Sequence, residues 1–136
     1  DRHFDNILIR KQDCTLFHID MNYILGEKLT GLDANEFGIT RELHELLNKQ
    51  NYEIFTNLAC KAFQLLREHY EELTNFCCLA FSYMADHKTV RAHILKQLKI
   101  EMSEQKAKQW LKSTLLKAPF DVQTQIKNKI HKFATR

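Results

Sequence analysis

The 136-residue sequence lacks several features that would assign a protein to a broad class. It has no apolar run approaching the roughly 20 residues that a membrane-spanning helix needs. Its four cysteines form no C-x-x-C pair and have no metal-ligand spacing to histidine, so we interpret them as reduced, mostly buried thiols. The formal net charge is only +3, which is too small to indicate a nucleic-acid partner.

The residues that are present predict a mainly α-helical fold with a small β-hairpin. Hydrophobic residues make up 44% of the chain, which is enough for one core. Near the N-terminus, the stretches NILIR (6–10) and LFHID (16–20) are rich in β-branched and aromatic residues, and the polar stretch KQDC (11–14) separates them. This pattern is typical of two strands joined by a turn.

Most of the chain after residue 40 shows helical spacing. The stretch TRELHELL (40–47) predicts a helix that Thr40 caps and that carries an apolar stripe of Leu43, Leu46 and Leu47. Two further helices are predicted by apolar residues at helical spacing: Phe55, Leu58, Ala59, Ala62, Leu65 and Leu66 in one, and Leu73, Phe76, Cys77, Ala80 and Met84 in the other. We expect about 90% of the apolar positions in the helices to belong to the core.

The C-terminal third predicts three more helical segments. One covers residues 89–98, a second begins after the N-cap Ser103 and ends near Leu116, and Pro119 suits the first turn of a third. We expect Trp110 to be a packed anchor. The last segment has an apolar stripe and a basic flank (Val122, Ile126, Ile130 and Phe133; Lys127, Lys129, Lys132 and Arg136), which suits either an acidic membrane surface or docking on the rest of the domain.

Three oxygen-bearing side chains bracket the predicted hairpin. Asp1 and Asn6 have the spacing D-x-x-x-x-N that a protein kinase catalytic loop uses for its base and a magnesium ligand, and Asp20 ends the second strand. Because a hairpin brings its two ends together, we expect these groups to converge, and hard oxygen ligands are what Mg²⁺ prefers. The alternative is a polar-ended hairpin without chemistry, since so short a motif also occurs by chance.

The stretches DRHFDNILI (1–9) and LFHID (16–20) resemble the catalytic loop and metal-binding strand of the phosphatidylinositol 3-kinase family, whose pattern is DRHxxN followed by HIDFG. Class III, the vacuolar protein sorting lipid kinase, is the most similar class. Three stretches favour it: YILG (23–26), HKTV (87–90) and IHKFA (130–134). The resemblance extends over the whole chain and implies the C-terminal lobe of a PI3/PI4-kinase-like, protein-kinase-like catalytic domain, so we expect a longer parent protein that supplies the smaller lobe.

The resemblance also implies the chemistry and the site. It implies transfer of the γ-phosphoryl group of ATP to the 3-hydroxyl of phosphatidylinositol, with Mg²⁺ or Mn²⁺ as the metal. Asp1 and His3 take the catalytic positions, with His3 accepting the hydroxyl proton, and Asn6 and Asp20 match the metal ligands. The implied partners are a regulatory protein-kinase-like subunit and a coiled-coil protein. The implied location is the cytoplasmic face of endosomal and autophagic membranes, in trafficking and autophagy.

The resemblance divides the chain into three parts: residues 1–26 as catalytic loop and metal-binding hairpin, 27–52 as activation-loop region and 53–136 as helical lobe. The middle part would recognise the lipid headgroup, with Lys28 and Arg41 as its substrate-binding residues. Acidic residues outnumber these two basic ones there (Glu27, Asp33, Glu36 and Glu42), so we expect a headgroup without extra phosphates.

One departure from the family pattern keeps other hypotheses open. Met21 and Asn22 replace the Phe-Gly that follows the metal-binding Asp. Methionine can fill an aromatic pocket, but asparagine carries a Cβ where a positive φ would favour glycine. The first alternative is therefore a catalytically silent scaffold. The second is a protein kinase of the related giant family, which shares DRHxxN and an HID strand.

Overall fold

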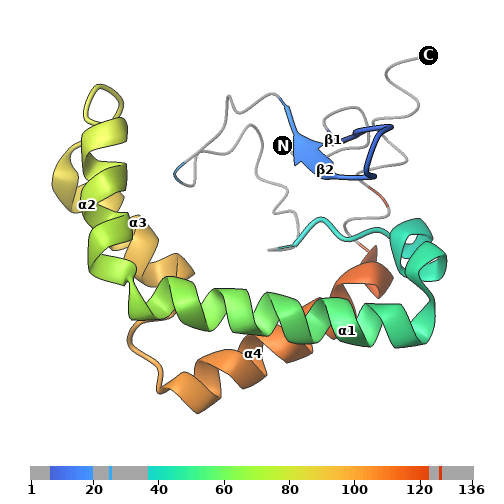
Figure 1. The fold of residues 1–136 in the computed structure, drawn as a ribbon. Helices are drawn as coiled ribbons and strands as arrows, with labels where there is room; N and C mark the ends of the chain where they lie inside the picture. Colours follow the sequence, from blue (N-terminus) through green and yellow to red (C-terminus); the bar gives the residue numbers. More distant parts are fainter. Residues whose placement is uncertain (1–6, 20–24, 26–36, 123–125, 127–136) are drawn as a thin grey trace.

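The computed structural model describes residues 7–19, 25, 37–122 and 126. Its elements are strands β1 (Ile7–Ile9) and β2 (Leu16–His18), helices α1 (Arg41–Glu68), α2 (Tyr70–Ala80), α3 (His87–Gln97) and α4 (Glu104–Lys117), and the 3₁₀ turn η2 (Ala118–Phe120). Figure 1 shows α4 running beside the long helix α1, and the α2–α3 pair standing at one end of α1. The predicted mainly helical fold with a two-stranded sheet is confirmed.

Helix α1 consists of two helical segments that meet at Asn48. The backbone of Asn48 is not helical, with φ 55° and ψ 172°. Its side-chain Oδ1 accepts a hydrogen bond from the backbone N–H of Asn51 at 3.1 Å, so Asn48 caps the second segment. Within the region 27–52, the residues from Arg41 onward are therefore helical except for Asn48.

The predicted cap of the first segment is confirmed, because Thr40 Oγ1 accepts a hydrogen bond from the backbone N–H of Leu43 at 3.2 Å. Leu43 and Leu47 pack against the core as predicted. The prediction for Leu46 was wrong, since its side chain is 78% exposed. Residue 44 completes the inner face instead: the His44 ring lies 4.5 Å from the ring of Tyr52, centroid to centroid.

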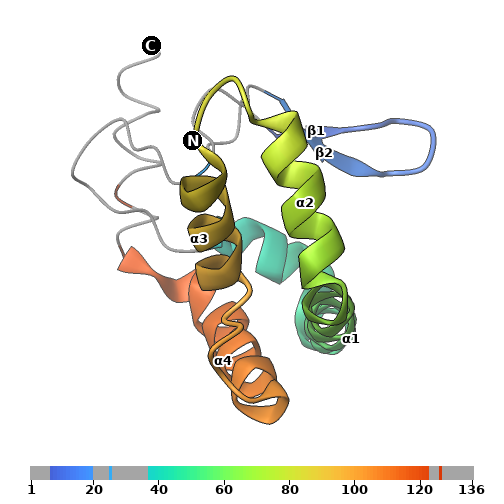
Figure 2. The same ribbon diagram turned by 90° about the vertical axis from the view of Figure 1, so that its left-hand side faces the viewer.

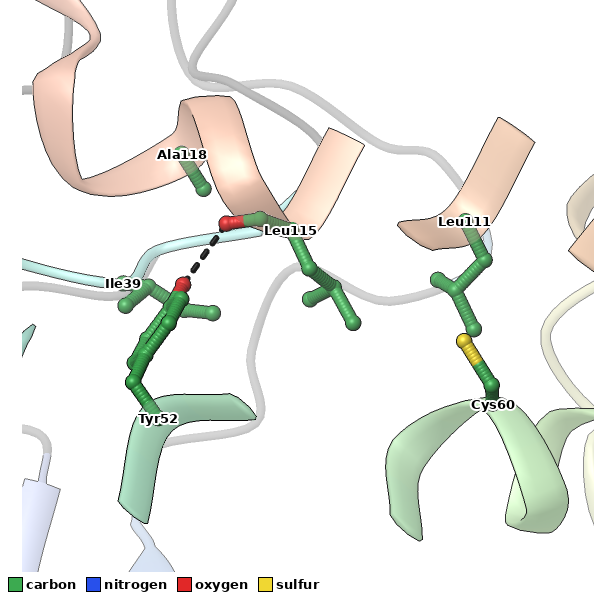
Figure 3. Packing of buried hydrophobic residues seen from close by; sticks show 6 residues of the cluster. All are labelled: Ile39, Tyr52, Cys60, Leu111, Leu115 and Ala118. Atoms are coloured by element: carbon green, nitrogen blue, oxygen red, sulfur yellow. Dashed lines mark hydrogen bonds between the residues drawn. The ribbon is translucent and has the colours of Figure 1, made fainter. Parts of the chain in front are cut away.

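The main core lies between the second segment of α1 and the α4–η2 unit. Figure 3 shows its buried residues: Ile39, Tyr52, Cys60, Leu111, Leu115 and Ala118. The Tyr52 hydroxyl donates a hydrogen bond to the backbone carbonyl of Leu115 at 2.6 Å, within the buried cluster. Because burial disfavours the charged phenolate, the pKa of Tyr52 is raised above its usual value.

The expectation that nearly all apolar helix positions are core was wrong for several residues. On α1, the inner face is formed by Tyr52, Thr56 and Cys60, one turn apart. The opposite face is also apolar, and it is exposed: Ile54, Leu58, Leu65 and Leu66. Helical spacing in the sequence identified an apolar stripe but could not indicate that only one of the two faces meets a neighbouring helix.

Helices α2 and α3 pack on each other as an antiparallel pair. Figure 2, which looks along the axis of α1, shows the two helices side by side. Their contact buries Thr74, Cys78 and Val90. The Cys78 thiol donates to the backbone carbonyl of His87 at 3.6 Å. Phe76, predicted to be core, is 68% exposed because it lies on the face of α2 turned away from this pair.

Side-chain caps define where α3 and α4 begin. Asp86 accepts from the backbone N–H of Thr89 at 2.7 Å and starts α3 at His87, two residues before the predicted position. The predicted cap Ser103 is confirmed, because its hydroxyl accepts from the backbone N–H of Lys106 at 3.4 Å. Pro119 is a buried residue of the 3₁₀ turn η2, whereas the sequence predicted it in the first turn of a further helix.

A guanidinium group on α1 holds the connection between α3 and α4. Arg67 Nη1 donates to the backbone carbonyls of Leu98 and Lys99, and Nη2 donates to that of Met102 at 2.8 Å. Lys99 has a left-handed backbone with φ 52°. Its Nζ lies 4.5 Å from the ring centroid of Trp110, which also packs on Phe63 and is the anchor that the sequence predicted.

Candidate active site

The β-hairpin is the part of the predicted catalytic region that the structure describes. Strands β1 and β2 are antiparallel, and Ile7 pairs with His18, Leu8 with Phe17 and Ile9 with Leu16. The predicted hairpin is therefore confirmed. In the sequence, Asn6 directly precedes the Ile7–His18 end of this ladder and Asp20 follows it by two residues.

Five of the six predicted site residues lie outside the described part of the chain: Asp1, His3, Asn6, Asp20 and Lys28. The structure neither brings them together nor separates them, so their roles stay predictions. Among the described residues, no three carboxylate, imidazole or thiol groups come together as a candidate metal site. Likewise, none of the helices described is long and apolar enough to cross a bilayer.

The turn of the hairpin is closed by a bidentate ion pair. Arg10 Nε and Nη2 donate to the two carboxylate oxygens of Asp13 at 2.8 and 2.6 Å. The Arg10 guanidinium thereby lowers the pKa of Asp13. Asp13 Oδ1 also accepts from the backbone N–H of Thr15 at 3.1 Å. These contacts fix the turn, and thus the register of the strands that precede and follow it.

A bulge completes this turn. The backbone N–H of Cys14 donates to Arg10 O, and the N–H of Arg10 donates to Thr15 O, both at 2.9 Å, so Cys14 and Thr15 together oppose Arg10. Cys14 has φ 58°, the conformation that glycine usually supplies at this position. Cys14 is exposed and Cys77 is half-buried, whereas Cys60 and Cys78 are buried as expected, and all four cysteines are free.

Of the two predicted substrate-binding residues, Arg41 lies in the part of the chain that the structure describes. It is the first residue of α1, and its Nε donates to Glu45 Oε1 at 3.0 Å. Its side chain is 62% exposed. The pair with Glu45 offsets the positive charge of Arg41 locally.

Sequence reasoning missed a basic surface on α4. The whole-chain charge of +3 conceals an uneven distribution. Residues 41–80 carry four basic and six acidic side chains, whereas residues 87–117 carry eight basic and two acidic ones, a net charge of +6. A charge count in segments, rather than over the chain, would have revealed this asymmetry.

Comparison with known proteins identifies the class to which the chain belongs. The sequence model of the family "Phosphatidylinositol 3- and 4-kinase" matches residues 1–94, which include the DRHFDN stretch, the hairpin and the helices as far as α3. The chain belongs to this family. Its hairpin and helical fold are consistent with that membership.

Two similar proteins carry more specific names than the family does. They are the nodule isoform and the root isoform of phosphatidylinositol 3-kinase from Glycine max, and each is 35% identical over 75 residues. The alignments cover 50% of this chain and 8% of each relative, so the chain spans a small fraction of their length. No solved structure matches the chain.

Proposed function

We propose that the protein is a class III-like phosphatidylinositol 3-kinase, which transfers the γ-phosphoryl group of ATP to the 3-hydroxyl of phosphatidylinositol. The observation that carries this proposal is the family match over residues 1–94, which contain each residue of the predicted catalytic set. The two soybean relatives, both named phosphatidylinositol 3-kinases, favour the 3-kinase branch of the family. The stretches YILG, HKTV and IHKFA support the class III assignment.

In this proposal the chain is the larger lobe of the kinase domain, divided at residues 26 and 52 as the resemblance implies. The inositol 3-hydroxyl attacks the γ-phosphorus in line, an O–P bond forms, and the bond to the ADP oxygen breaks. His3 accepts the hydroxyl proton, since a neutral imidazole does so near pH 7, and Asp1 shares the catalytic loop. Lys28 and Arg41 would contact an inositol ring without extra phosphates.

The donor set suits a magnesium ion. Asn6 offers an amide oxygen and Asp20 a carboxylate, which are hard ligands of the kind that kinases combine with nucleotide phosphates. These two residues would hold Mg²⁺, or Mn²⁺. The bound ion would supply positive charge that stabilises the negative charge developing during phosphoryl transfer.

The cellular setting is part of the same proposal. The product, phosphatidylinositol 3-phosphate, would form on the cytoplasmic face of endosomal and autophagic membranes. A regulatory protein-kinase-like subunit and a coiled-coil protein would be the partners. These assignments rest on the resemblance to class III alone, and co-purification of the full-length protein from its own cells is their direct test.

A catalytically silent scaffold is the second candidate, and Met21-Asn22 favours it because these residues replace Phe-Gly next to the predicted metal ligand. The deciding experiment incubates the full-length protein with ATP, Mg²⁺ and phosphatidylinositol vesicles, and then determines which hydroxyl carries the phosphate. A 3-phosphate product supports the proposal. A 4-phosphate product would assign the protein to the other branch of the family, and binding of nucleotide without any product would favour the scaffold.

A further inference from the structure

The irregular stretch 37–40, which leads into α1, is held against the core by two apolar side chains. Ile39 is only 8% exposed and belongs to the main core cluster, where Figure 3 shows it among the buried residues. Phe37 is half-buried and packs against the same cluster. No backbone hydrogen bond joins residues 37–39 to another described residue, so side-chain packing holds this stretch in place.

The partner of Phe37 is an aromatic side chain on α4. The ring centroids of Phe37 and Trp110 lie 6.4 Å apart, and the two rings are inclined at 50°. Trp110 also packs on the Phe63 ring of α1, with 5.9 Å between the centroids. The indole therefore contacts both α1 and the stretch that precedes it, and aromatic pairs at such distances stabilise packing beyond the area that they bury. Phe37, Ile39 and Trp110 together form what we term the helix-start anchor.

The helix-start anchor determines where α1 begins. Thr40 directly follows Ile39 and caps the helix, since its Oγ1 accepts from the backbone N–H of Leu43. Arg41, one of the two predicted substrate-binding residues, is the first residue of α1. Its side chain is exposed and pairs with Glu45 one turn along the same helix, so its position follows that of the helix start.

We propose that the helix-start anchor positions Arg41 for the lipid headgroup, which makes Phe37, Ile39 and Trp110 positioning residues of the kinase reaction. This proposal deepens the lipid kinase function proposed above and rests on it. An exposed side chain that pairs within its own helix is kept in a fixed place only if the helix itself is held by packing. Because a misplacement of about 1 Å, caused far from the reacting atoms, can lower the rate by about 100-fold, α4 can influence the reaction through its contact with Phe37.

The test compares two alanine variants of the full-length protein that alter contacts of the same indole. Phe37→Ala removes the ring of the anchor, whereas Phe63→Ala removes an equally half-buried ring that packs on Trp110 from α1. Apparent affinity falls in proportion to the population of the binding-competent state, so Phe37→Ala should raise the KM for phosphatidylinositol by about tenfold. Since Arg41 is assigned to the headgroup, the KM for ATP should stay within about twofold of the wild-type value. Phe63→Ala should leave both constants within about twofold.

Equal increases in the two alanine variants would overturn the proposal, because they would reflect a general loss of packing around Trp110. An unchanged KM for phosphatidylinositol in Phe37→Ala would also overturn it. Phe37→Tyr keeps the ring and should therefore retain the wild-type KM. A tenfold increase in that conservative variant as well would show that the ring contact is not what positions Arg41.

Hydrogen exchange of the backbone amides separates this proposal from the proposed function. A wild-type protein without kinase turnover refutes the kinase, and with it the headgroup role of Arg41, but the anchor can still be measured. Residues 37–47 should exchange about tenfold faster in Phe37→Ala than in Phe63→Ala, because only the first variant releases the stretch that precedes α1. Equal exchange in the two variants would overturn the anchor itself, whether or not the protein is a kinase.

Discussion

Replacement of Arg67 by methionine should destabilise the packing of helices α1, α3 and α4, because this one side chain joins α1 to the segment that connects α3 and α4. Its guanidinium donates to the carbonyls of Leu98, Lys99 and Met102, all of which lie between the end of α3 and the start of α4. It also lies over the Phe63 ring, with 5.9 Å between Cζ and the ring centroid. Methionine keeps the apolar stem and removes every donor.

The magnitude follows from the number and kind of these hydrogen bonds. A bond from a charged donor contributes about 1.5–3 kcal/mol, but three bonds from one group do not add fully, and these part-buried carbonyls can recruit water. We therefore expect Arg67→Met to lower the free energy of unfolding by about 3 kcal/mol. Arg67→Lys retains the charge but lacks the fork that reaches several carbonyls, so it should lose about half as much.

Urea unfolding of the two variants, followed by circular dichroism, measures this loss. Arg91→Met is the matched control, because Arg91 forms a comparable bidentate contact, with Glu71, on the exposed surface of the α2–α3 pair. Exposed ion pairs contribute little, so the control should remain close to the wild type. Equal losses for Arg67→Met and Arg91→Met would refute the role given to the Arg67 contacts.

Two further perturbations test the local structure of α1. Tyr52→Phe leaves the buried carbonyl of Leu115 without its donor and should lower the free energy of unfolding by about 1–3 kcal/mol, measured by thermal or urea unfolding. Because folding raises the pKa of Tyr52, the stability that the protonated hydroxyl contributes is present below pH 10.0 and is lost above it. Above pH 10.0 the variant should therefore lose less stability than the wild type. Asn48→Ala removes the side chain that accepts from Asn51 N–H but leaves a residue with a Cβ at a left-handed φ, whereas glycine adopts this φ without strain. The Asn48→Gly variant should therefore be more stable than the Asn48→Ala variant by about 1–3 kcal/mol. The reverse order of stability would contradict a strained backbone at Asn48.

The sequence predicted the ends of the elements better than their buried faces. Thr40 and Ser103 were identified as caps because a side-chain oxygen before a helical stretch acts locally, with no need of tertiary information. Asn48 was missed, since asparagine inside a polar stretch gives no comparable signal. Leu58 and Phe76 were assigned to the core because periodicity marks an apolar stripe, whereas burial depends on which helix packs against it.

For the candidate site, too, the sequence predicted only part of what the structure shows. The hairpin could be predicted from alternating polar and apolar stretches, and the turn contacts of Arg10 and Asp13 explain its register. The α4 lysines were not recognised as a surface, because their significance depends on the buried positions of Ala107, Leu111 and Leu115, which orient the helix. Asp1, His3, Asn6 and Asp20 were proposed from motif and resemblance, and only an activity measurement can test them.

The most direct test of the proposed lipid kinase compares two Asp→Asn variants from the same hairpin region. Asp20→Asn weakens the predicted metal site, whereas Asp13→Asn makes the same change at the exposed turn, where the carboxylate pairs with Arg10. Both variants are assayed in the full-length protein for phosphorylation of phosphatidylinositol vesicles with ATP and Mg²⁺. We predict that Asp20→Asn abolishes formation of the 3-phosphate and that Asp13→Asn retains it. Turnover that survives Asp20→Asn, or is absent from the folded wild-type protein, would contradict the account.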